Sequence, residues 1–441
     1  MNSAIPLRIA IVGAGWAGMA AAVRAVELGH DVTVFEAARS LGGRARGVPL
    51  ALPDGREVMV DNGQHILIGA YADCLQLMRK VGVDPAAALL RLPLALRYPD
   101  GHGLVLPDWP APLDAAAGIA TARGWSWRER LALLRAALGW RRAGFQCDEG
   151  ASVAELCAGL PPRLQAEFIE PLCVSALNTP MHEASARVFL RVLRDALFGV
   201  RGGSNLLLPR IDLSALFPQA AAHWIAVRGA RVLTGRRVEA LAWQAPHWRI
   251  DGQPFDRVLL ATSAPNAAQI AVQSAQAAAS SIASPLQAWA HGAARLRHRA
   301  ITTVYAQADS GGTPALLRAP MLALRSGPGA PAQFVFERDA ITRPAQATRL
   351  LAFVVSASEG ERGALETAIA AQAQAQLQLA VTPLLTVIEK RATFACTPAL
   401  QRPPSHIAPG LLACGDYIDG PYPATLEGAV RSGRQAAEAL R

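Results

Sequence analysis

The sequence predicts an α/β fold built on a parallel sheet and joined to a second region of α+β character. Residues 7–12 form a short aliphatic and β-branched run, as expected for a parallel strand that is covered on both faces. A glycine-rich turn follows at residues 13–18, and an apolar stretch over residues 16–28 predicts a helix. Residues 31–35 have strand character again. Strand, turn, helix and strand in this order predict a βαβ unit.

The turn carries a G-x-G-x-x-G pattern at Gly13, Gly15 and Gly18. The first glycine allows the tight turn, the second lets a pyrophosphate approach the backbone, and the third lets the helix pack closely on the strand. Trp16 and Ala17 begin the helix, whose unpaired amide groups face the phosphates. The pattern therefore predicts a Rossmann-like dinucleotide site.

An acidic residue ends the second strand. Glu36 lies eighteen residues after Gly18, where a carboxylate can accept both hydroxyl groups of an adenosine ribose. Its negative charge repels a 2′-phosphate, which favours FAD or NAD over NADP. Ala37 follows directly and is expected to contact the same nucleotide.

The next segment distinguishes an FAD site from an NAD site. Arg39, the glycine pair Gly42 and Gly43, and Arg44 can bring backbone amides and a fixed positive charge onto the pyrophosphate or the flavin edge. The alternative is a surface turn with solvated arginines. This pattern resembles the extension found in the flavin amine oxidase and phytoene desaturase superfamily, which implies FAD as the cofactor.

A second motif lies at the C-terminus. A strand over residues 411–414 ends in Gly415 and Asp416, and a glycine-containing helix begins near Thr425 and Leu426. Asp416 can accept a ribitol hydroxyl, and the helix start can direct amides at the flavin carbonyl edge. A plain C-terminal helix would not need this arrangement. The motif resembles the closing motif of the same superfamily.

A polar segment follows the flavin loop. In superfamily members the chain passes the reactive ring here, so Asp61, Asn62, Gln64 and His65 are candidates for polar contacts with it. Asp61 and His65 are also candidates for a proton donor. The alternative is that the first two residues form a turn and that His65 is an ordinary satisfied polar group.

The superfamily resemblance implies two interleaved domains. Members place a valine backbone against the adenine, and Val238 is the matching position. The predicted FAD-binding domain comprises residues 1–70, 205–265 and 395–441, and the predicted substrate domain comprises residues 71–204 and 266–394. Within these we expect helices at 127–142, from 152, at 163–177, 184–198, 220–228 and 361–379, short strands around Val232 and Val238 and at 258–261, and a second sheet from strands at 300–307, 333–337, 349–356 and 385–391.

Composition narrows the class of protein. The 441 residues are 51% hydrophobic and only 17% charged, which suggests an apolar ligand or a membrane surface. The formal net charge of +9 suits anionic lipid, and no nucleic-acid-binding module is evident. Six scattered cysteines without a C-x-x-C pair indicate reduced thiols of the cytoplasm, and no metal site is predicted. The strand starts too early for a signal peptide, and residues 258–294, although uncharged, are too polar and proline-broken to span a membrane.

Residues 105–145 are rich in tryptophan and arginine. Ser126 and Glu129 form a capping box for the helix at 127–142, which carries leucines on one face. A basic helix with Trp and Leu is typical of an interfacial membrane contact. The alternative is an ordinary surface helix that packs its leucines inward.

Taken together, the two terminal motifs, the polar segment and residues 202–210 resemble the hydroxysqualene dehydroxylases, which are squalene-associated FAD proteins of bacterial hopanoid synthesis. The resemblance implies reductive removal of an allylic hydroxyl from the isoprenoid lipid hydroxysqualene, in a protein held peripherally on the inner face of the cytoplasmic membrane. It leaves the electron donor unidentified. The alternatives are a carotenoid-type desaturase, which runs hydride the other way, and a flavin-bearing lipid-binding protein without turnover.

Overall fold

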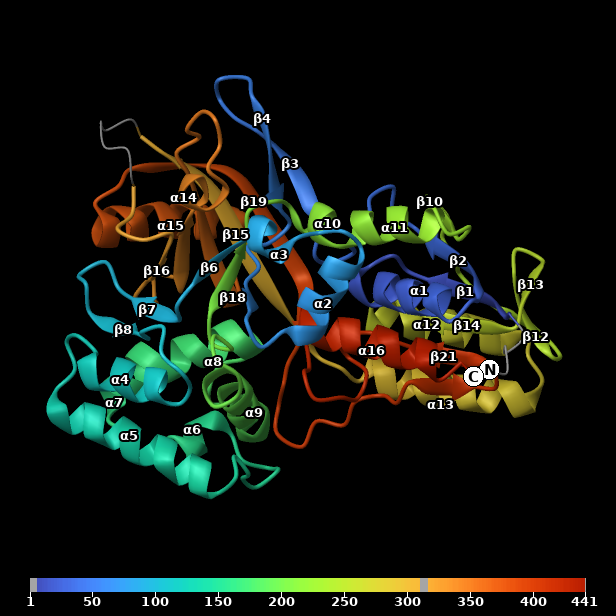
Figure 1. The fold of residues 1–441 in the computed structure, drawn as a ribbon, viewed down its shortest axis with the longest axis horizontal. Helices are drawn as coiled ribbons and strands as arrows, with labels where there is room; N and C mark the ends of the chain where they lie inside the picture. Colours follow the sequence, from blue (N-terminus) through green and yellow to red (C-terminus); the bar gives the residue numbers. More distant parts are fainter. Residues whose placement is uncertain (1–5, 310–315, 441) are drawn as a thin grey trace.

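A six-stranded sheet dominates one end of the molecule in the computed structural model, which describes residues 6–309 and 316–440 (Figure 1). Five strands are parallel, and the edge strand β20 is antiparallel to its neighbour. Both faces of the sheet are buried, which explains the absence of charge inside its strands. In spatial order the strands are β10 (Arg231–Thr234), β2 (Asp31–Glu36), β1 (Arg8–Val12), β14 (Arg257–Leu260), β21 (Leu411–Ala413) and β20 (His406–Ala408).

The predicted βαβ unit and the α/β fold class are confirmed. The helix α1 (Trp16–Glu27) starts directly after Gly15 and joins β1 to β2. Ile9 and Ile11 pack toward α1, and their neighbours Ala10 and Val12 pack on the opposite face. This alternation places apolar residues in both layers beside the sheet.

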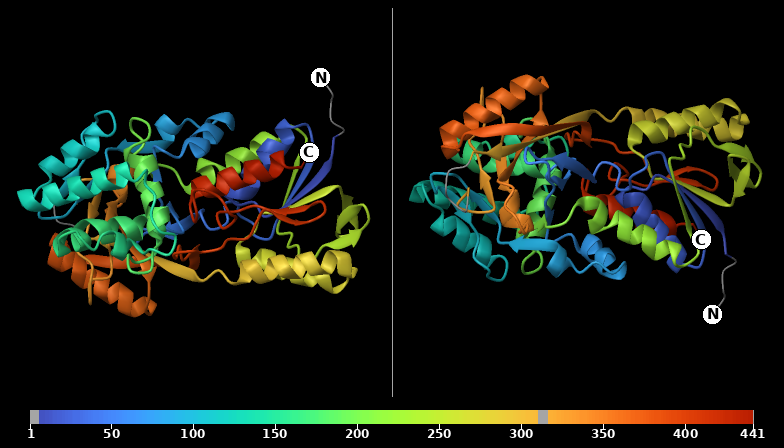
Figure 2. Two further views of the ribbon diagram at one scale, coloured as in Figure 1. Left: turned by 90° about the horizontal axis from the view of Figure 1, so that it is seen from below. Right: turned by 90° about the horizontal axis from the view of Figure 1, so that it is seen from above.

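Helices cover both faces of this sheet (Figures 1 and 2). The helices α1, α11 (Pro218–Ala226) and α16 (Leu426–Glu438) pack together on one face. The other face carries α12 (Ala264–Gln276), α13 (Ser280–Ala294) and a small sheet of β11 (Ala242–Gln244), β12 (His247–Ile250) and β13 (Gln253–Phe255).

One expected element is absent at this sheet, and one domain boundary stays a prediction. The predicted boundary at residue 265 assigns α12 and α13 to the substrate domain, and both helices lie beside the six-stranded sheet (Figures 1 and 2). The expected strand at Val238 does not form, because the chain leaves the sheet after Thr234 in an irregular segment. We retain the two-part division of the chain as a proposal.

A second, antiparallel sheet of five strands forms the other half, and its predicted strands are confirmed. One face packs on α15 through residues such as Val304 and Phe353. The other face, which includes Tyr305 and Phe336, points toward the interior shared with the first half. The elements are β16 (Met321–Ala323), β17 (Phe334–Glu337), β18 (Leu350–Ser358), β15 (His298–Ala308) and β19 (Val381–Phe394), with α14 (Arg338–Thr342) and α15 (Arg362–Leu377).

The remaining elements connect the two sheets or form a layer of helices, α4 to α9, at the end away from the six-stranded sheet (Figure 1). We call these helices the helical layer. The predicted helix over 163–177 is interrupted by one turn of π-helix, η1. None of the helices in the described ranges has both the length and the apolarity needed to cross a bilayer. The elements are β3 (Gly47–Ala51), β4 (Glu57–Asp61), β5 (Leu67–Ile68), α2 (Ala72–Lys80), α3 (Pro85–Ala88), β6 (Leu89–Leu92), β7 (Ala95–Arg97), β8 (Gly103–Val105), α4 (Leu113–Thr121), α5 (Trp127–Arg142), α6 (Val153–Leu156), α7 (Pro162–Leu164), η1 (Gln165–Ile169), α8 (Glu170–Leu177), α9 (Ala186–Leu197), β9 (Leu206–Pro209) and α10 (Leu213–Leu216).

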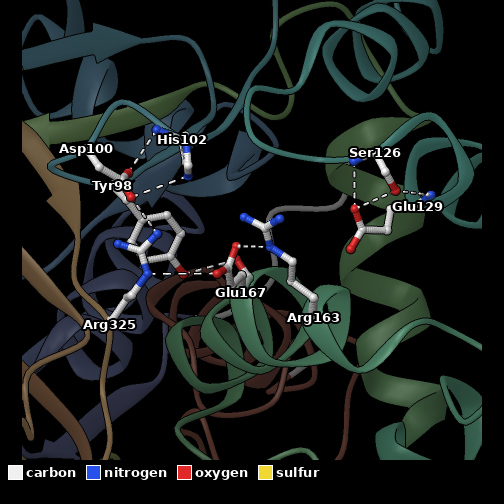
Figure 3. Close-up of polar contacts among 8 residues, drawn as sticks. All are labelled: Tyr98, Asp100, His102, Ser126, Glu129, Arg163, Glu167 and Arg325. Carbon is white, nitrogen blue, oxygen red and sulfur yellow. Dashed lines mark hydrogen bonds and ion pairs between the residues drawn. The ribbon is translucent and has the colours of Figure 1, made fainter.

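A polar cluster ties the helical layer to the second sheet (Figure 3). Arg325, which follows β16, donates to Asp100 at 2.7 Å and lies 3.8 Å from the Glu167 carboxylate. Its guanidinium also lies 4.8 Å from the centre of the Tyr98 ring, whose hydroxyl donates to the Glu167 carbonyl at 3.0 Å. One arginine thus contacts both the β7–β8 hairpin and η1 from the end of β16.

Candidate active site

A cavity of about 740 Å³ lies where the two sheets meet. It is lined by strand ends of the six-stranded sheet, by the starts of α1 and α16, and by α8 and the second sheet. The sequence-predicted residues that line it are Gly13, Gly15, Trp16, Ala17, Glu36, Ala37, Gly42, Gly43, Arg44, Asn62, Gln64, His65, Val238, Gly415, Asp416, Thr425 and Leu426. Gly18, Arg39 and Asp61 are not among its lining residues.

Two glycines shape the turn under the cavity. Gly13 has a φ of +110°, and a Cβ there would lie 2.7 Å from the Ala261 carbonyl oxygen. A Cβ at Gly18 would lie 1.9 Å from the Gly13 carbonyl oxygen. Gly18 therefore acts from behind the cavity by letting α1 approach the turn, which is why it lines no part of it.

The start of α1 is an open anion site. Gly15 is its N-cap and supplies no side-chain acceptor to the first amides. A Cβ at Gly15 would meet nothing closer than the Gly42 carbonyl oxygen at 3.9 Å. Free amides and an uncrowded backbone at the start of a twelve-residue helix suit the pyrophosphate of a dinucleotide.

Glu36 is held at the edge of the cavity by two backbone donors. Its carboxylate accepts from the amides of Ala14 at 2.7 Å and Ala38 at 2.8 Å. A carboxylate has further lone pairs beyond these two bonds, so it can still accept the ribose hydroxyls. Arg39 is exposed and lies outside the cavity, because the chain has turned to the surface there.

Arg44 and Asp416 join the two predicted motifs. Arg44 Nη2 donates to Asp416 Oδ1 at 2.5 Å, and Nη1 donates to the Ala392 carbonyl at 2.8 Å. Burial alone would lower the pKa of Arg44, but the adjacent Asp416 carboxylate outweighs it and raises that pKa. Two segments more than 370 residues apart in the chain therefore present a fixed pair of opposite charges to the cavity.

The C-terminal motif closes the same wall. Thr425 is the N-cap of α16, and its hydroxyl accepts from the Gly428 amide at 3.0 Å. A Cβ at Gly433 would lie 2.1 Å from the Ala17 carbonyl oxygen, so this glycine lets α16 lie directly on α1. The two terminal segments thus place two helix starts, those of α1 and α16, on one cavity.

These residues fit FAD. The uncrowded glycine backbone suits the pyrophosphate, Glu36 suits the ribose, and Asp416 with the start of α16 suits the ribitol and ring edge. Their assignment to individual cofactor atoms remains our proposal.

Asp61, one of the two candidates for a proton donor, does not line the cavity. Its side chain is fully buried, and Oδ1 accepts from the Leu213 amide at 2.8 Å at the start of α10. Burial raises its pKa to about 7, partly opposed by the Leu213 hydrogen bond and the charge of Arg338. Asp61 belongs to the polar segment that the sequence analysis singled out, but in the fold its carboxyl contacts the start of α10 and is not part of the cavity lining.

His65 lines the cavity as a neutral acceptor. Its Nδ1 lies 2.7 Å from the Gly63 carbonyl oxygen, which can only accept, so Nδ1 carries the hydrogen. Burial, and to a smaller extent the charge of Arg44, lowers the pKa of His65, which favours the neutral ring. Nε2 is therefore unprotonated, and this geometry suits accepting a hydrogen bond rather than donating a proton.

An apolar group of side chains lines part of the cavity on the side of the second sheet, where Ser356, Glu389 and Thr393 also contribute. Ile301, Phe334, Phe336 and Val354 contribute from the second sheet, and Val174 contributes from α8. These side chains offer no hydrogen bonds, so this wall suits a hydrocarbon ligand.

Several residues that line the cavity were not predicted from the sequence. Thr262 and Ser263 follow the carboxyl end of β14, where ligands bind in parallel sheets, so the position of that strand could have indicated them. Asn178 and Glu389 carry no such local signal. Asn178 adopts a left-handed conformation with φ of 46°, and its side chain donates to Thr393 Oγ1 at 2.9 Å, a contact that only the tertiary fold creates.

The chain was compared with known proteins. The profile of the family described as flavin containing amine oxidoreductase matches residues 16–441. A hydroxysqualene dehydroxylase of Sinorhizobium fredii is 26% identical over 458 residues, which cover 98% of this chain and 98% of that protein. Another, from Rhodopseudomonas palustris, is 28% identical over 466 residues, which cover 97% of each. A zeta-carotene desaturase of Synechocystis is 42% identical over 76 residues, which cover 17% of this chain and 15% of that protein.

The predicted resemblance to hydroxysqualene dehydroxylases is confirmed by the two full-length relatives. An oxidoreductase from Methanosarcina mazei has a similar crystal structure, with a TM-score of 0.72 at 16% identity, covering 98% of this chain and 99% of that chain. At this identity the likeness concerns the fold alone. The family match and the geometry of the cavity agree, and the chain therefore belongs to the flavin containing amine oxidoreductase family and is an FAD-dependent oxidoreductase.

Proposed function

We propose that this protein removes the allylic hydroxyl of hydroxysqualene reductively, giving squalene. The observation that carries the proposal is the cavity, which combines an FAD-type site with an apolar wall from the second sheet and α8. The two full-length relatives bear the name of this activity.

The reaction replaces a C–O bond by a C–H bond and releases water, so it consumes one hydride and one proton. When bound and reduced, FAD supplies hydride transfer. The electron donor that reduces it is unidentified.

The apolar wall has two tasks in this proposal. Phe334, Phe336, Val354 and Ile301 exclude water from the reacting carbon, which protects an allylic cation from capture. They also bind the hydrocarbon chain, since each buried CH₂ group contributes about 0.8 kcal/mol.

The hydroxyl leaves as water only if a proton reaches it. Asp61 does not line the cavity, and His65 presents an acceptor at Nε2, so we assign the role of general acid to neither residue in this proposal. We propose that His65 instead contacts the substrate as a hydrogen-bond acceptor.

The test is a single-turnover experiment. The flavin of the purified, FAD-loaded protein is reduced anaerobically, hydroxysqualene is added, and flavin reoxidation is followed with squalene formation. We expect both signals to rise together, at one squalene per flavin. Flavin that stays reduced, with no squalene, would exclude this activity.

The same assay separates the alternatives. A carotenoid-type desaturase would leave hydroxysqualene unchanged but would reduce oxidised flavin when phytoene is added. A flavin-bearing lipid carrier would bind the substrate without any change of flavin redox state.

We also propose that the helical layer contacts the cytoplasmic face of the bacterial membrane. Large apolar side chains are exposed there, with Trp127 68%, Leu113 61%, Trp109 54% and Leu138 50% accessible. Within α5, only Leu133 is buried, although this basic helix is sixteen residues long. Exposed Trp and Leu beside arginines suit the headgroup region of anionic lipid.

This contact is tested by sedimentation with vesicles. The wild-type protein should sediment with phosphatidylglycerol vesicles and less with phosphatidylcholine vesicles. A variant that combines Trp127→Ser with Leu138→Ser should sediment less with both. Equal sedimentation of variant and wild type would contradict the assignment of α5 as the contact.

A further inference from the structure

A buried arginine holds the Gln64 side chain in one orientation. Arg338, only 4% exposed, begins α14 directly after the cavity-lining strand β17. Its Nη1 lies 2.8 Å from Gln64 Oε1. Because a guanidinium carries only donors, the side-chain atom that it contacts must be the amide oxygen, and the Gln64 amide cannot be flipped.

The fixed amide leaves one N–H group for the cavity. Gln64 Nε2 donates to the His65 carbonyl at 3.3 Å, which uses one of its two hydrogens. Among the described residues, the second hydrogen has no further acceptor, and Gln64 lines the cavity. The wall therefore offers a hydrogen-bond donor at this position.

The next residue offers the complementary group. The His65 ring is neutral, with its hydrogen on Nδ1 directed to the Gly63 carbonyl, so Nε2 is an acceptor. Gln64 and His65 are consecutive, and both line the cavity. These two consecutive residues thus present one donor, Gln64 Nε2, and one acceptor, His65 Nε2.

A hydroxyl group is the ligand that matches such a pair, since its oxygen accepts and its hydrogen donates. We propose that Gln64 and His65 bind the hydroxyl of the isoprenoid alcohol, and that Arg338 acts as a positioning residue for Gln64. This inference rests on the proposed function for the identity of the alcohol. It adds the residues that distinguish the alcohol from the hydrocarbon product.

The surroundings of Arg338 favour a positioning role. Its guanidinium bonds the Gln64 amide and forms no ion pair with a carboxylate in the described part of the chain, and its buried Nε has no partner there. Asp61 affects it only through the field of its charge. A cation buried merely for stability is expected to form a direct pair with a carboxylate, because burying an unpaired charge is unfavourable.

Binding of two ligands tests the inference without turnover. Radiolabelled hydroxysqualene and squalene are equilibrated, in detergent micelles, with the FAD-loaded wild type and with variants. The wild type should bind the alcohol more tightly than squalene. Gln64→Glu keeps an acceptor for Arg338 but removes the N–H donor, so it should bind the alcohol about tenfold more weakly, as expected for one lost hydrogen bond, and squalene as before.

Two further comparisons isolate Arg338. Arg338→Met should also lose preference for the alcohol, and Arg338→Lys, which retains a donor, should recover part of it. The matched control Gln287→Glu makes the same exchange as Gln64→Glu at an exposed glutamine of α13 that does not line the cavity, and it should leave both affinities unchanged.

The outcomes are distinguishable. A Gln64→Glu variant that keeps its preference for the alcohol, or that loses affinity for both ligands equally, would overturn the inference. A wild type that prefers the alcohol but never converts it would support the inference and refute the proposed function.

Discussion

Replacing Asp61 with asparagine tests how the fold uses this carboxyl. The side chain is fully buried, and the asparagine oxygen can still accept from the Leu213 amide at the start of α10. The exchange therefore removes a titrating proton while it keeps shape and the observed hydrogen bond. Its effect on stability should depend on pH.

The magnitude follows from the raised pKa. A rise from the ordinary 3.8 to about 7 means that ionising Asp61 in the folded protein costs about 4 kcal/mol more than in the unfolded chain, at about 1.4 kcal/mol per pKa unit. The attraction to Arg338 is already contained in that pKa.

The sign is fixed by proton binding. Between pH 4 and 7 the folded protein binds the Asp61 proton more tightly than the unfolded chain, so the wild type loses stability as pH rises through this window. The asparagine variant has no such loss. We expect it to be more stable than the wild type by about 4 kcal/mol at pH 8 and by only about 1 kcal/mol at pH 4.5, where the unfolded chain is already largely ionised.

Urea unfolding of both proteins at the two pH values, followed by circular dichroism, measures this difference. The same preparations should retain single-turnover activity, because Asp61 does not line the cavity. A stability difference that does not change with pH would refute the buried-acid assignment. Abolished turnover in a folded, FAD-loaded variant would restore Asp61 as a proton donor.

Three further predictions concern the cofactor wall and the thiols. Gly18→Ala should destabilise the protein by about 1–3 kcal/mol and weaken FAD binding, because the added Cβ would clash with the Gly13 carbonyl oxygen. Thermal unfolding measures the stability and flavin fluorescence titration measures the affinity for FAD. Unchanged values in both would contradict this prediction. Arg44→Leu should lower the free energy of unfolding of the FAD-free protein by about 2 kcal/mol. Breaking a fully buried ion pair costs about 3–5 kcal/mol, and the loss here is smaller because Arg44 is partly exposed. A loss under about 0.5 kcal/mol would show that Asp416 finds other partners. Under native conditions Cys147 should react first with a thiol reagent, because the other five cysteines are buried; equal reactivity of all six would be inconsistent with the fold.

Local patterns determined a large part of the fold. The β1–α1–β2 unit, the capping box of Ser126 and Glu129, and the strands of the second sheet all formed as predicted. Each depends on the conformational preference of a few consecutive residues, such as the positive φ that Gly13 tolerates. The local sequence determines such preferences, because they require no contact with residues distant in the chain.

The predicted nucleotide residues also lie mainly on the cavity, for the same reason. A glycine turn at the carboxyl end of a strand can face only the crevice above the sheet, and an acidic residue at the end of the next strand lies beside it. The sequence therefore identified residues that line the cavity, Val238 among them although the strand expected there does not form, and their contacts with the cofactor stay a prediction.

Only the tertiary structure decided which polar groups can meet a substrate. Asp61 and His65 are neighbours in the sequence, yet one is sealed against α10 and the other lines the cavity. The orientation of Gln64 depends on Arg338, which lies 274 residues away in the chain. Burial, tautomer and charge arise from atoms that the fold brings together from distant segments, and no local pattern encodes them.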